Sequence, residues 1–133
     1  DGLGLISYFD STNADLKAAH CDDVACSSAT ASAIDTAGTV GWHTSITVAS
    51  DGLGVISYYR FDTGNLKIAR CRNVTCSQAS SAGVDSAGDV GTYSSITIGP
   101  DGMPLVSYED TASSDLKVVH CSNRFCIPHV RYR

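Results

Sequence analysis

At 133 residues and 43% apolar residues, the chain has the size and composition of one ordinary globular domain. Its net charge is −5 and its nine basic residues are scattered singly, which argues against nucleic acid as a partner. The longest apolar runs are a few residues, far short of the roughly 20 that a membrane-spanning helix needs, so we expect no membrane span.

The sequence repeats with a period of fifty residues. Residues 1–8 (DGLGLISY) return in similar form at 51–58 and 101–108. We therefore predict one repeat domain, 1–133, with repeats at 1–50 and 51–100 and an incomplete repeat at 101–133. The sequence opens inside the repeat, without an initiator Met or a leader, so we expect a processed or excised piece.

Each repeat contains four short segments typical of β-strands and no window of helical periodicity. In the middle repeat these segments are Ser45–Ala49, Gly54–Tyr59, Leu66–Cys71 and the Ser/Ala-rich Cys76–Val84. Turn residues separate them, as at Asp51-Gly52, where glycine accepts a positive φ. Four antiparallel strands in about fifty residues match one β-propeller blade. We predict an all-β fold of about 2.7 four-stranded blades.

The polarity of the strands indicates where each lies in a blade. The second and third strands are apolar on both faces, as expected of a sheet packed between neighbouring blades. The polar fourth strand suits an exposed outer edge, and the hydroxyl-rich Ser45–Ala49 suits the innermost position. The recurring Tyr8, Tyr58 and Tyr108 are predicted to occupy equivalent, largely buried sites in successive blades.

Six cysteines form three C-x4-C pairs, each between the third and fourth strands: Cys21/Cys26, Cys71/Cys76 and Cys121/Cys126. This spacing suits a hairpin end, where facing residues lie within disulfide reach. A metal site is the competing interpretation, but it would need thiolates from different blades, and no His completes a zinc spacing. We predict three local disulfides and an oxidising location, which is secreted or extracellular, or else periplasmic or at the cell surface.

One of the cysteine loops contains a glycosylation sequon, Asn73-Val74-Thr75. Asn73 is therefore a possible glycosylation site. In a bacterial product the same three residues would usually carry no sugar.

Residues Ile56–Tyr59 and Gly64–Lys67, with Asp89–Ile96 between repeats, resemble the SYYD/NGDLK-type repeats of secreted bacterial proteins. Those repeats are similar in pattern to sialidase-like and other carbohydrate-associated β-propellers. The resemblance extends to Cys126 and implies propeller architecture and an extracellular setting. The Asp-box of sialidases (Ser-x-Asp-x-Gly-x-x-Trp) is absent, so the resemblance carries no catalytic residue to this chain.

Two sets of residues are candidates for ligand binding. His20, Arg70 and His120 occupy one basic position, which would bind a glycan acid or phosphate between blades, or else hydrogen-bond a backbone carbonyl. Trp42 and Tyr93 are taken to share a position ahead of the innermost strand, where aromatic rings either stack on a sugar or pack between blades.

No Ser/His/Asp set or paired carboxylates stand out from the repeated background, so we predict no catalytic residue, no metal site, no cofactor and no enzyme. The leading interpretation is a secreted structural module that assembles with itself. The alternative is a lectin-like propeller that binds glycans in grooves between blades. A glycan-array screen beside a mass measurement in solution separates the two.

Closed propellers have about four to eight blades, so fewer than three cannot close a ring. We expect either a homo-oligomer, closed or filamentous, or a fragment of a longer propeller. The predicted contacts lie at Gly2–Tyr8 and at Lys117–Cys126 with the tail Ile127–Arg133. Pro128 departs from the repeat and weakens a regular fourth strand there.

Overall fold

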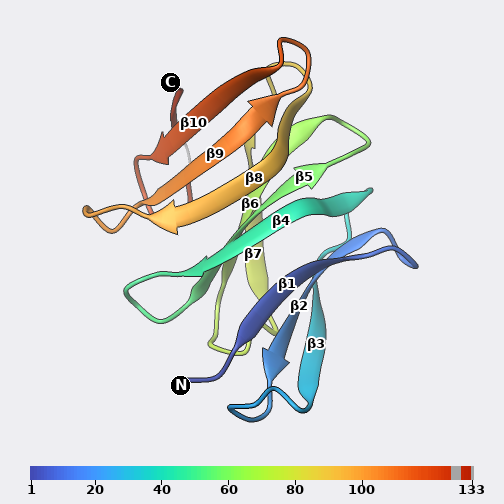
Figure 1. The fold of residues 1–133 in the computed structure, drawn as a ribbon, viewed down its shortest axis with the longest axis vertical. Coiled ribbons are helices and arrows are strands. Elements are labelled where there is room, and N and C mark those ends of the chain that lie inside the picture. Colours follow the sequence, from blue (N-terminus) through green and yellow to red (C-terminus); the bar gives the residue numbers. More distant parts are fainter. Residues whose placement is uncertain (127–129, 133) are drawn as a thin grey trace.

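The computed structural model describes residues 1–126 and 130–132, which form an all-β structure (Figure 1). Its strands are β1 (Leu5–Asp10), β2 (Asp15–Cys21), β3 (Ala29–Asp35), β4 (Val40–Val48), β5 (Gly54–Arg60), β6 (Asn65–Cys71), β7 (Ala79–Asp85), β8 (Val90–Ile98), β9 (Pro104–Asp110), β10 (Asp115–Cys121) and β11 (Val130–Tyr132). Among the described residues, no helix has the length and apolar character needed to cross a membrane.

The strands form three antiparallel sheets: the first sheet (β1-β2-β3), the middle sheet (β4-β5-β6-β7) and the third sheet (β8-β9-β10-β11). The middle sheet lies between the other two, and the described strands form an open array without a closed ring (Figure 1). The fifty-residue repeat of the sequence is therefore a repeat of the structure. Among the described residues, no strand of the first sheet corresponds to β4 or β8.

Asp-Gly turns connect β4 and β8, the strands predicted to be innermost, to the next strand of their sheets. Gly52 has a φ of 82°, which glycine adopts readily, and the Asp51 carboxylate accepts a hydrogen bond of 3.0 Å from the amide of Leu53. The turn sets the register that places Val48 opposite Gly54. The tight turn expected from the sequence is confirmed at this position.

The innermost strands begin earlier than predicted, since β4 starts at Val40 rather than at Ser45. The ladder is interrupted between Trp42 and Ser45, where His43 has a φ of 51°. This irregularity interrupts the alternation of side chains that is typical of a strand. The sequence pattern therefore revealed only the part of β4 that follows the irregularity, from Ser45 onward.

The expectation that Trp42 and Tyr93 share a position is wrong. Tyr93 has a φ of 52° and is the equivalent of His43, which has a φ of 51°. Trp42 pairs across the ladder with Tyr59, and it is Thr92 that holds the same place in the third sheet.

Burial differs between middle and outer strands as the polarity of the sequence predicts. From Gly54 to Tyr59 every residue of β5 is buried, because both faces of the middle sheet pack against a neighbouring sheet. In contrast, β7 has only its last two residues buried, Val84 and Asp85. The apolar core therefore lies between the sheets.

The three predicted disulfides are confirmed: Cys21–Cys26, Cys71–Cys76 and Cys121–Cys126, with Cα–Cα distances of 4.9, 4.8 and 4.7 Å. Their placement differs from the prediction, because Cys76 lies in the loop at a positive φ and the outer strand begins only at Ala79. Each bond therefore closes a loop rather than joining facing residues of a ladder. Three disulfides indicate an oxidising environment outside the cytoplasm.

The predicted equivalence of the recurring tyrosines holds for two of the three. Tyr58 is 0% exposed and Tyr108 is 1% exposed, whereas Tyr8 is only half-buried. The difference arises because the face of the first sheet that carries Tyr8 has no neighbouring sheet among the described residues.

The C-terminal tail is described in part. Val130–Tyr132 forms the short strand β11, whose backbone pairs with β10. The predictions about Pro128 and the rest of the tail fall on residues 127–129 and 133, which lie outside the described residues.

Candidate functional site

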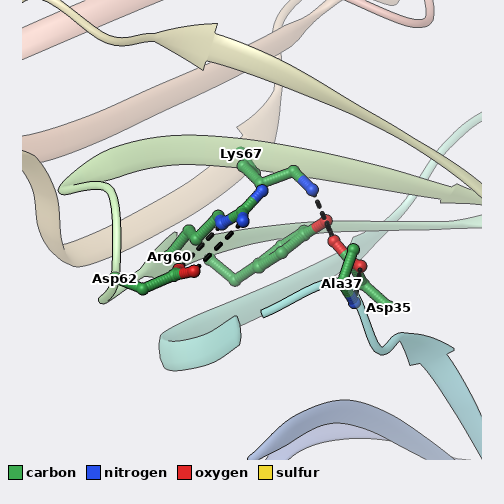
Figure 2. Close-up of polar contacts among 6 residues, drawn as sticks. Asp35, Ala37, Arg60, Asp62 and Lys67 are labelled. Atoms are coloured by element: carbon green, nitrogen blue, oxygen red, sulfur yellow. Dashed lines mark hydrogen bonds and ion pairs between the residues drawn. The ribbon is translucent and has the colours of Figure 1, made fainter. Parts of the chain in front are cut away.

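The contact between the first and middle sheets is built around the carboxylate of Asp35. Tyr58 donates its hydroxyl to one carboxylate oxygen at 2.6 Å, and the ammonium of Lys67 reaches the same oxygen at 2.6 Å. The other oxygen accepts the backbone N–H of Ala37 at 3.0 Å. Figure 2 shows the Lys67 ammonium pointing toward Asp35. Because Asp35 ends β3 while both donors come from the middle sheet, this contact joins the two sheets.

The same contact joins the middle and third sheets. Asp85, at the end of β7, accepts the Tyr108 hydroxyl and the Lys117 ammonium, each at 2.7 Å. In both junctions the tyrosine lies 23 residues and the lysine 32 residues after the aspartate. We name this arrangement the aspartate junction: Asp35/Tyr58/Lys67 and Asp85/Tyr108/Lys117.

Both junction carboxylates are ionised despite their burial. Asp35 is 6% exposed and Asp85 is 2% exposed, and burial alone would raise the pKa of each. The ammonium and hydroxyl donors outweigh burial, so the pKa of both carboxyls lies below the ordinary value. Burial and the neighbouring carboxylate raise the pKa of Tyr58 far above its ordinary value, so its hydroxyl remains a hydrogen-bond donor.

A glycine lets β4 and β8 approach the neighbouring sheet at each junction. A Cβ on Gly91 would lie 2.7 Å from Cα of Leu66, and one on Gly41 would lie 2.8 Å from Cα of Leu16. Both glycines have a positive φ, 110° and 105°. Since a side chain would meet backbone atoms, these positions require glycine.

Paired hydroxyls add a third element to each junction. The side chains of Ser57 and Ser94 are both buried and lie 2.8 Å apart. At the corresponding place between the first and middle sheets, Thr44 donates to Ser7 at 2.9 Å. The sheets are thus held by charge, close packing and hydroxyl pairing together.

The outward faces of the two end sheets carry the same residue types, and no sheet among the described residues covers them. Ile6 is 49% exposed, whereas its equivalent Ile56 is 0% exposed. Leu116 is 74% exposed, whereas its equivalent Leu66 is 0% exposed. A hollow of about 220 Å³ lies beside Leu116. We name these surfaces the first-sheet face (Ile6, Tyr8, Lys17, Ala19) and the third-sheet face (Tyr93, Ser107, Leu116, Val118).

The predicted basic position has a partner within its own sheet. In each repeat this side chain pairs with the aspartate of the Asp-Gly turn. The pairs are His20–Asp1 at 2.8 Å, Arg70–Asp51 and His120–Asp101 at 2.8 Å. The basic residue therefore stabilises the turn through a carboxylate that neither interpretation specified. Arg70 in addition donates to the backbone carbonyl of Arg124 at 3.5 Å, as the carbonyl interpretation predicted.

The three basic side chains differ in accessibility. His20 and Arg70 are 8% and 5% exposed, and the Arg70 guanidinium also lies 5.6 Å from the ring centroid of Phe125. His120 remains accessible, with a side chain 48% exposed. The structure does not bring the three together into one groove, since each lies in its own sheet.

Trp42 and Tyr93 belong to one aromatic cluster although their positions are not equivalent. The members of the aromatic cluster are Phe9, Trp42, His43, Tyr59, Phe61 and Tyr93. The Trp42 ring stacks on Phe61 with centroids 4.9 Å apart, and His43 lies 4.2 Å from Tyr93. Phe61 and Tyr93 are 56% and 71% exposed. The indole Nε1 of Trp42 is buried without a hydrogen-bond partner among the described atoms.

The side chain of Asn73 is engaged in closing its loop. Its oxygen accepts the N–H of Ser77 at 3.0 Å, and its Nδ2 donates to the Ser77 hydroxyl at 2.7 Å. Asp23 makes the corresponding contacts with Ser27 in the first loop. Asn73 therefore has a structural role, and its glycosylation stays a prediction.

Sequence reasoning missed the aspartate junction. Two signals were present, because Asp-x-Ala-Gly occurs at 35–38 and 85–88 and a Leu-Lys pair recurs in every repeat. In this sequence context each aspartate looks like a turn residue, because a glycine follows three positions later. Its partners lie 23 and 32 residues away, in a different sheet, so no local pattern connects them.

No model of a known protein family matches the chain, and no curated protein matches it. In the part of the chain that the structure describes, no group of three or more His, Cys, Asp or Glu side chains is placed to hold a metal ion. The features of the described residues that bear on function are the junctions, the two end faces and the aromatic cluster.

Proposed function

We propose that the chain is a secreted structural module, a stretch of β-propeller whose sheets are blades and whose role is assembly with copies of itself. The observation that carries the proposal is that each end of the array presents one half of a contact the chain makes twice internally. Leu66 is fully covered at its junction, whereas Leu116 is 74% exposed. The proposal assigns the chain no reaction.

The order of strands supports the blade interpretation. The middle sheet runs from a partly buried first strand, β4, through a buried second strand, β5, to a largely exposed fourth, β7. Successive sheets pack face to face along the chain (Figure 1). Four such strands per fifty residues is the composition of a propeller blade. The disulfides support export to an oxidising compartment, of which secretion is the form we propose.

The physical drive for assembly is burial of the two end faces against each other. Fully burying a leucine or isoleucine side chain stabilises a contact by about 1.5–3 kcal/mol. Ile6 and Leu116 are both exposed in a single chain, so their burial would stabilise the assembly. The first-sheet face of one copy would meet the third-sheet face of the next, a head-to-tail contact. Such contacts generate a ring when the rotation closes and a filament when it does not.

Sedimentation velocity across a range of protein concentrations tests this proposal. We expect a homo-oligomer at about 10 μM, a concentration at which an association of about −7 to −8 kcal/mol is visible. Ile6→Asp and Leu116→Asp should each produce monomers, since a charge on either face prevents its burial. Val24→Asp, in a loop where Val24 is 88% exposed, is the matched control and should assemble normally. A folded monomer at every concentration would contradict self-assembly.

Carbohydrate binding by the aromatic cluster is the second candidate function. Phe61 and Tyr93 present exposed rings at its margin, and exposed aromatic faces are surfaces on which sugar rings stack. A glycan array tests it, with Phe61→Ala and Tyr93→Ala as variants. We expect both to lose any glycan bound by the parent chain. Glycan binding that survives both substitutions, or no glycan bound at all, would contradict this candidate.

A further inference from the structure

A small cavity lies between the middle sheet and the loop that the third disulfide closes, residues 121–126. Its volume is about 20 Å³, which is enough for one group of the size of a water molecule. Two of its residues, Val55 and Ile68, belong to the core between the middle and third sheets, so the cavity lies at that junction. Apolar, hydroxyl and basic side chains line it, among them Val55, Ile68, Ser80, Phe125, Arg70 and Arg124.

Arg70 lines this cavity with N–H donors left over. Its side chain is buried, with 5% of the residue exposed, and a guanidinium has five N–H donors. Among the described residues, its acceptors are the carboxylate of Asp51 and, at a long 3.5 Å, the backbone carbonyl of Arg124. Because buried polar groups ordinarily have their hydrogen bonds satisfied, the remaining donors indicate a further acceptor at the cavity.

Two more arginines lie beside Arg70. The Nε of Arg72 donates to the hydroxyl of Ser80 at 2.9 Å, and Ser80 lines the cavity. The guanidinium of Arg124 lies 3.8 Å from the carboxylate of Asp51, and its side chain is 57% exposed. We name these three residues the arginine group. In the part of the chain that the structure describes, Asp51 is the carboxylate that pairs with this group, so positive charge is in excess there.

The corresponding place between the first and middle sheets carries different residues. Val74 occupies the position of Arg124, and Asp22 occupies the position of Arg72. Thr30 donates to Asp22 at 3.1 Å, so a carboxylate lies where the other junction has a guanidinium. Packing of one sheet on the next therefore does not require the arginine group, which indicates a separate role for it at the junction of the middle and third sheets.

We propose that the arginine group binds a phosphate or sulfate group, with one oxygen in the cavity beside Arg70 and the others toward Arg72 and Arg124. A phosphate ester carries about −1.5 to −2 charges at pH 7 and three acceptor oxygens, which matches the excess of positive charge. Its tetrahedral oxygens suit donors from several side chains, whereas one arginine satisfies both oxygens of a planar carboxylate. The site does not involve the end faces, so it is independent of the proposed assembly.

NMR titration of the full-length chain with inorganic phosphate and with inorganic sulfate tests the inference. We expect saturable shifts of the amides in β6 and in residues 121–126. Sodium acetate, whose carboxylate is planar, should bind more weakly. Titration with glucose 6-phosphate and with glucose distinguishes the sources of the anion. Tighter binding of the sugar phosphate than of inorganic phosphate would identify an ester as the source, the reverse order would identify the free ion, and either order supports the site.

Two substitutions test the arginine group without removing the buried Arg70. Arg124→Val and Arg72→Asp place the residues of the other junction at these positions, so both variants should fold, which a thermal melt checks. Arg124→Val should weaken phosphate binding about tenfold, as expected for the loss of one charge-assisted hydrogen bond, and the double variant should show no saturable binding. Arg60→Gln, at the opposite end of β5, removes the same charge and should bind like the parent.

The inference is overturned if neither phosphate nor sulfate produces saturable shifts at these amides. It is also overturned if phosphate binding survives in the folded double variant, if Arg60→Gln weakens it as much as Arg124→Val does, or if acetate binds as tightly as phosphate. The result is separate from that of the sedimentation experiment, because phosphate binding is expected from monomers and oligomers alike.

Discussion

The aspartate junction and the first-sheet face contain the same residue types at equivalent positions. Tyr58 and Lys67 enclose Asp35, and Tyr58 is 0% exposed. Among the described residues, no aspartate of a neighbouring sheet reaches Tyr8 or Lys17, and Lys17 pairs with Asp10 instead. Each of the two complete repeats, 1–50 and 51–100, therefore encodes both halves of an interface. Whether a given half is core or surface depends on the neighbour it meets.

The third-sheet face gives the complementary comparison. Leu16 and Leu66 are each covered by the glycine of the following innermost strand, whereas Leu116 is 74% exposed. Identical side chains thus differ in burial according to their order in the array. Substitutions at equivalent positions should reveal this difference directly.

Gly91→Ala should produce the largest effect on the internal junction. The new Cβ would lie 2.7 Å from a backbone atom of Leu66 at a φ of 110°, and overpacking plus strain together cost about 4 kcal/mol. Gly52→Ala is the control, since Gly52 has a φ of 82° but no atom within 4 Å of its Cβ position. It should cost about 1 kcal/mol. Urea unfolding measures both, and equal losses would show that close approach to Leu66 is unimportant.

The next largest effect should be the difference between Leu66→Ala and Leu116→Ala in the free energy of unfolding. Leu66 is 0% exposed, so its truncation should lower the free energy of unfolding by about 3 kcal/mol. Leu116 is 74% exposed, and in dilute, monomeric protein its truncation should change stability by less than about 0.5 kcal/mol. Denaturant melts at low and high protein concentration provide the measurement. A concentration-independent loss of several kcal/mol in Leu116→Ala would mean that this side chain is already packed.

Acid should lower the stability of the junctions by less than the Gly91→Ala and Leu66→Ala substitutions do. The pKa of Asp35 and Asp85 is lower in the folded chain than the ordinary 3.8, so the unfolded chain binds protons more readily. The stability they contribute is complete above about pH 4 and is lost as the pH falls through their folded pKa. Asp35→Asn should cost about 2 kcal/mol at pH 7 and flatten this acid dependence.

Thermal melts between about pH 7 and pH 2 measure the acid effect, over the range in which carboxyl groups titrate. Asp115→Asn, at an exposed position on β10, is the control and should retain the acid dependence of the parent chain. If Asp35→Asn shows the same acid dependence as the parent, the junction carboxylate is not the group that responds.

Several features of the fold were predictable because they depend on neighbours in the sequence. The Asp-Gly turns, the middle strands and the Cys71–Cys76 loop each arise within about ten residues, so turn preference, polarity and spacing reveal them. The start of β4 was not predictable in the same way, because the left-handed His43 breaks the strand pattern. The basic position was found, but its turn partner Asp51 was not, since it lies 19 residues before Arg70.

The sequence by itself determined the all-β class, the fifty-residue unit and the three disulfides, because local spacing and repetition are sufficient for each. Only the tertiary structure decided that Asp35 is a buried junction residue and that Tyr8 is half-buried while Tyr58 is enclosed. The physical reason is that burial and electrostatic pairing are properties of two surfaces in contact. A repeated sequence gives each sheet the same two faces. The packing of one sheet on the next decides which of these faces become buried.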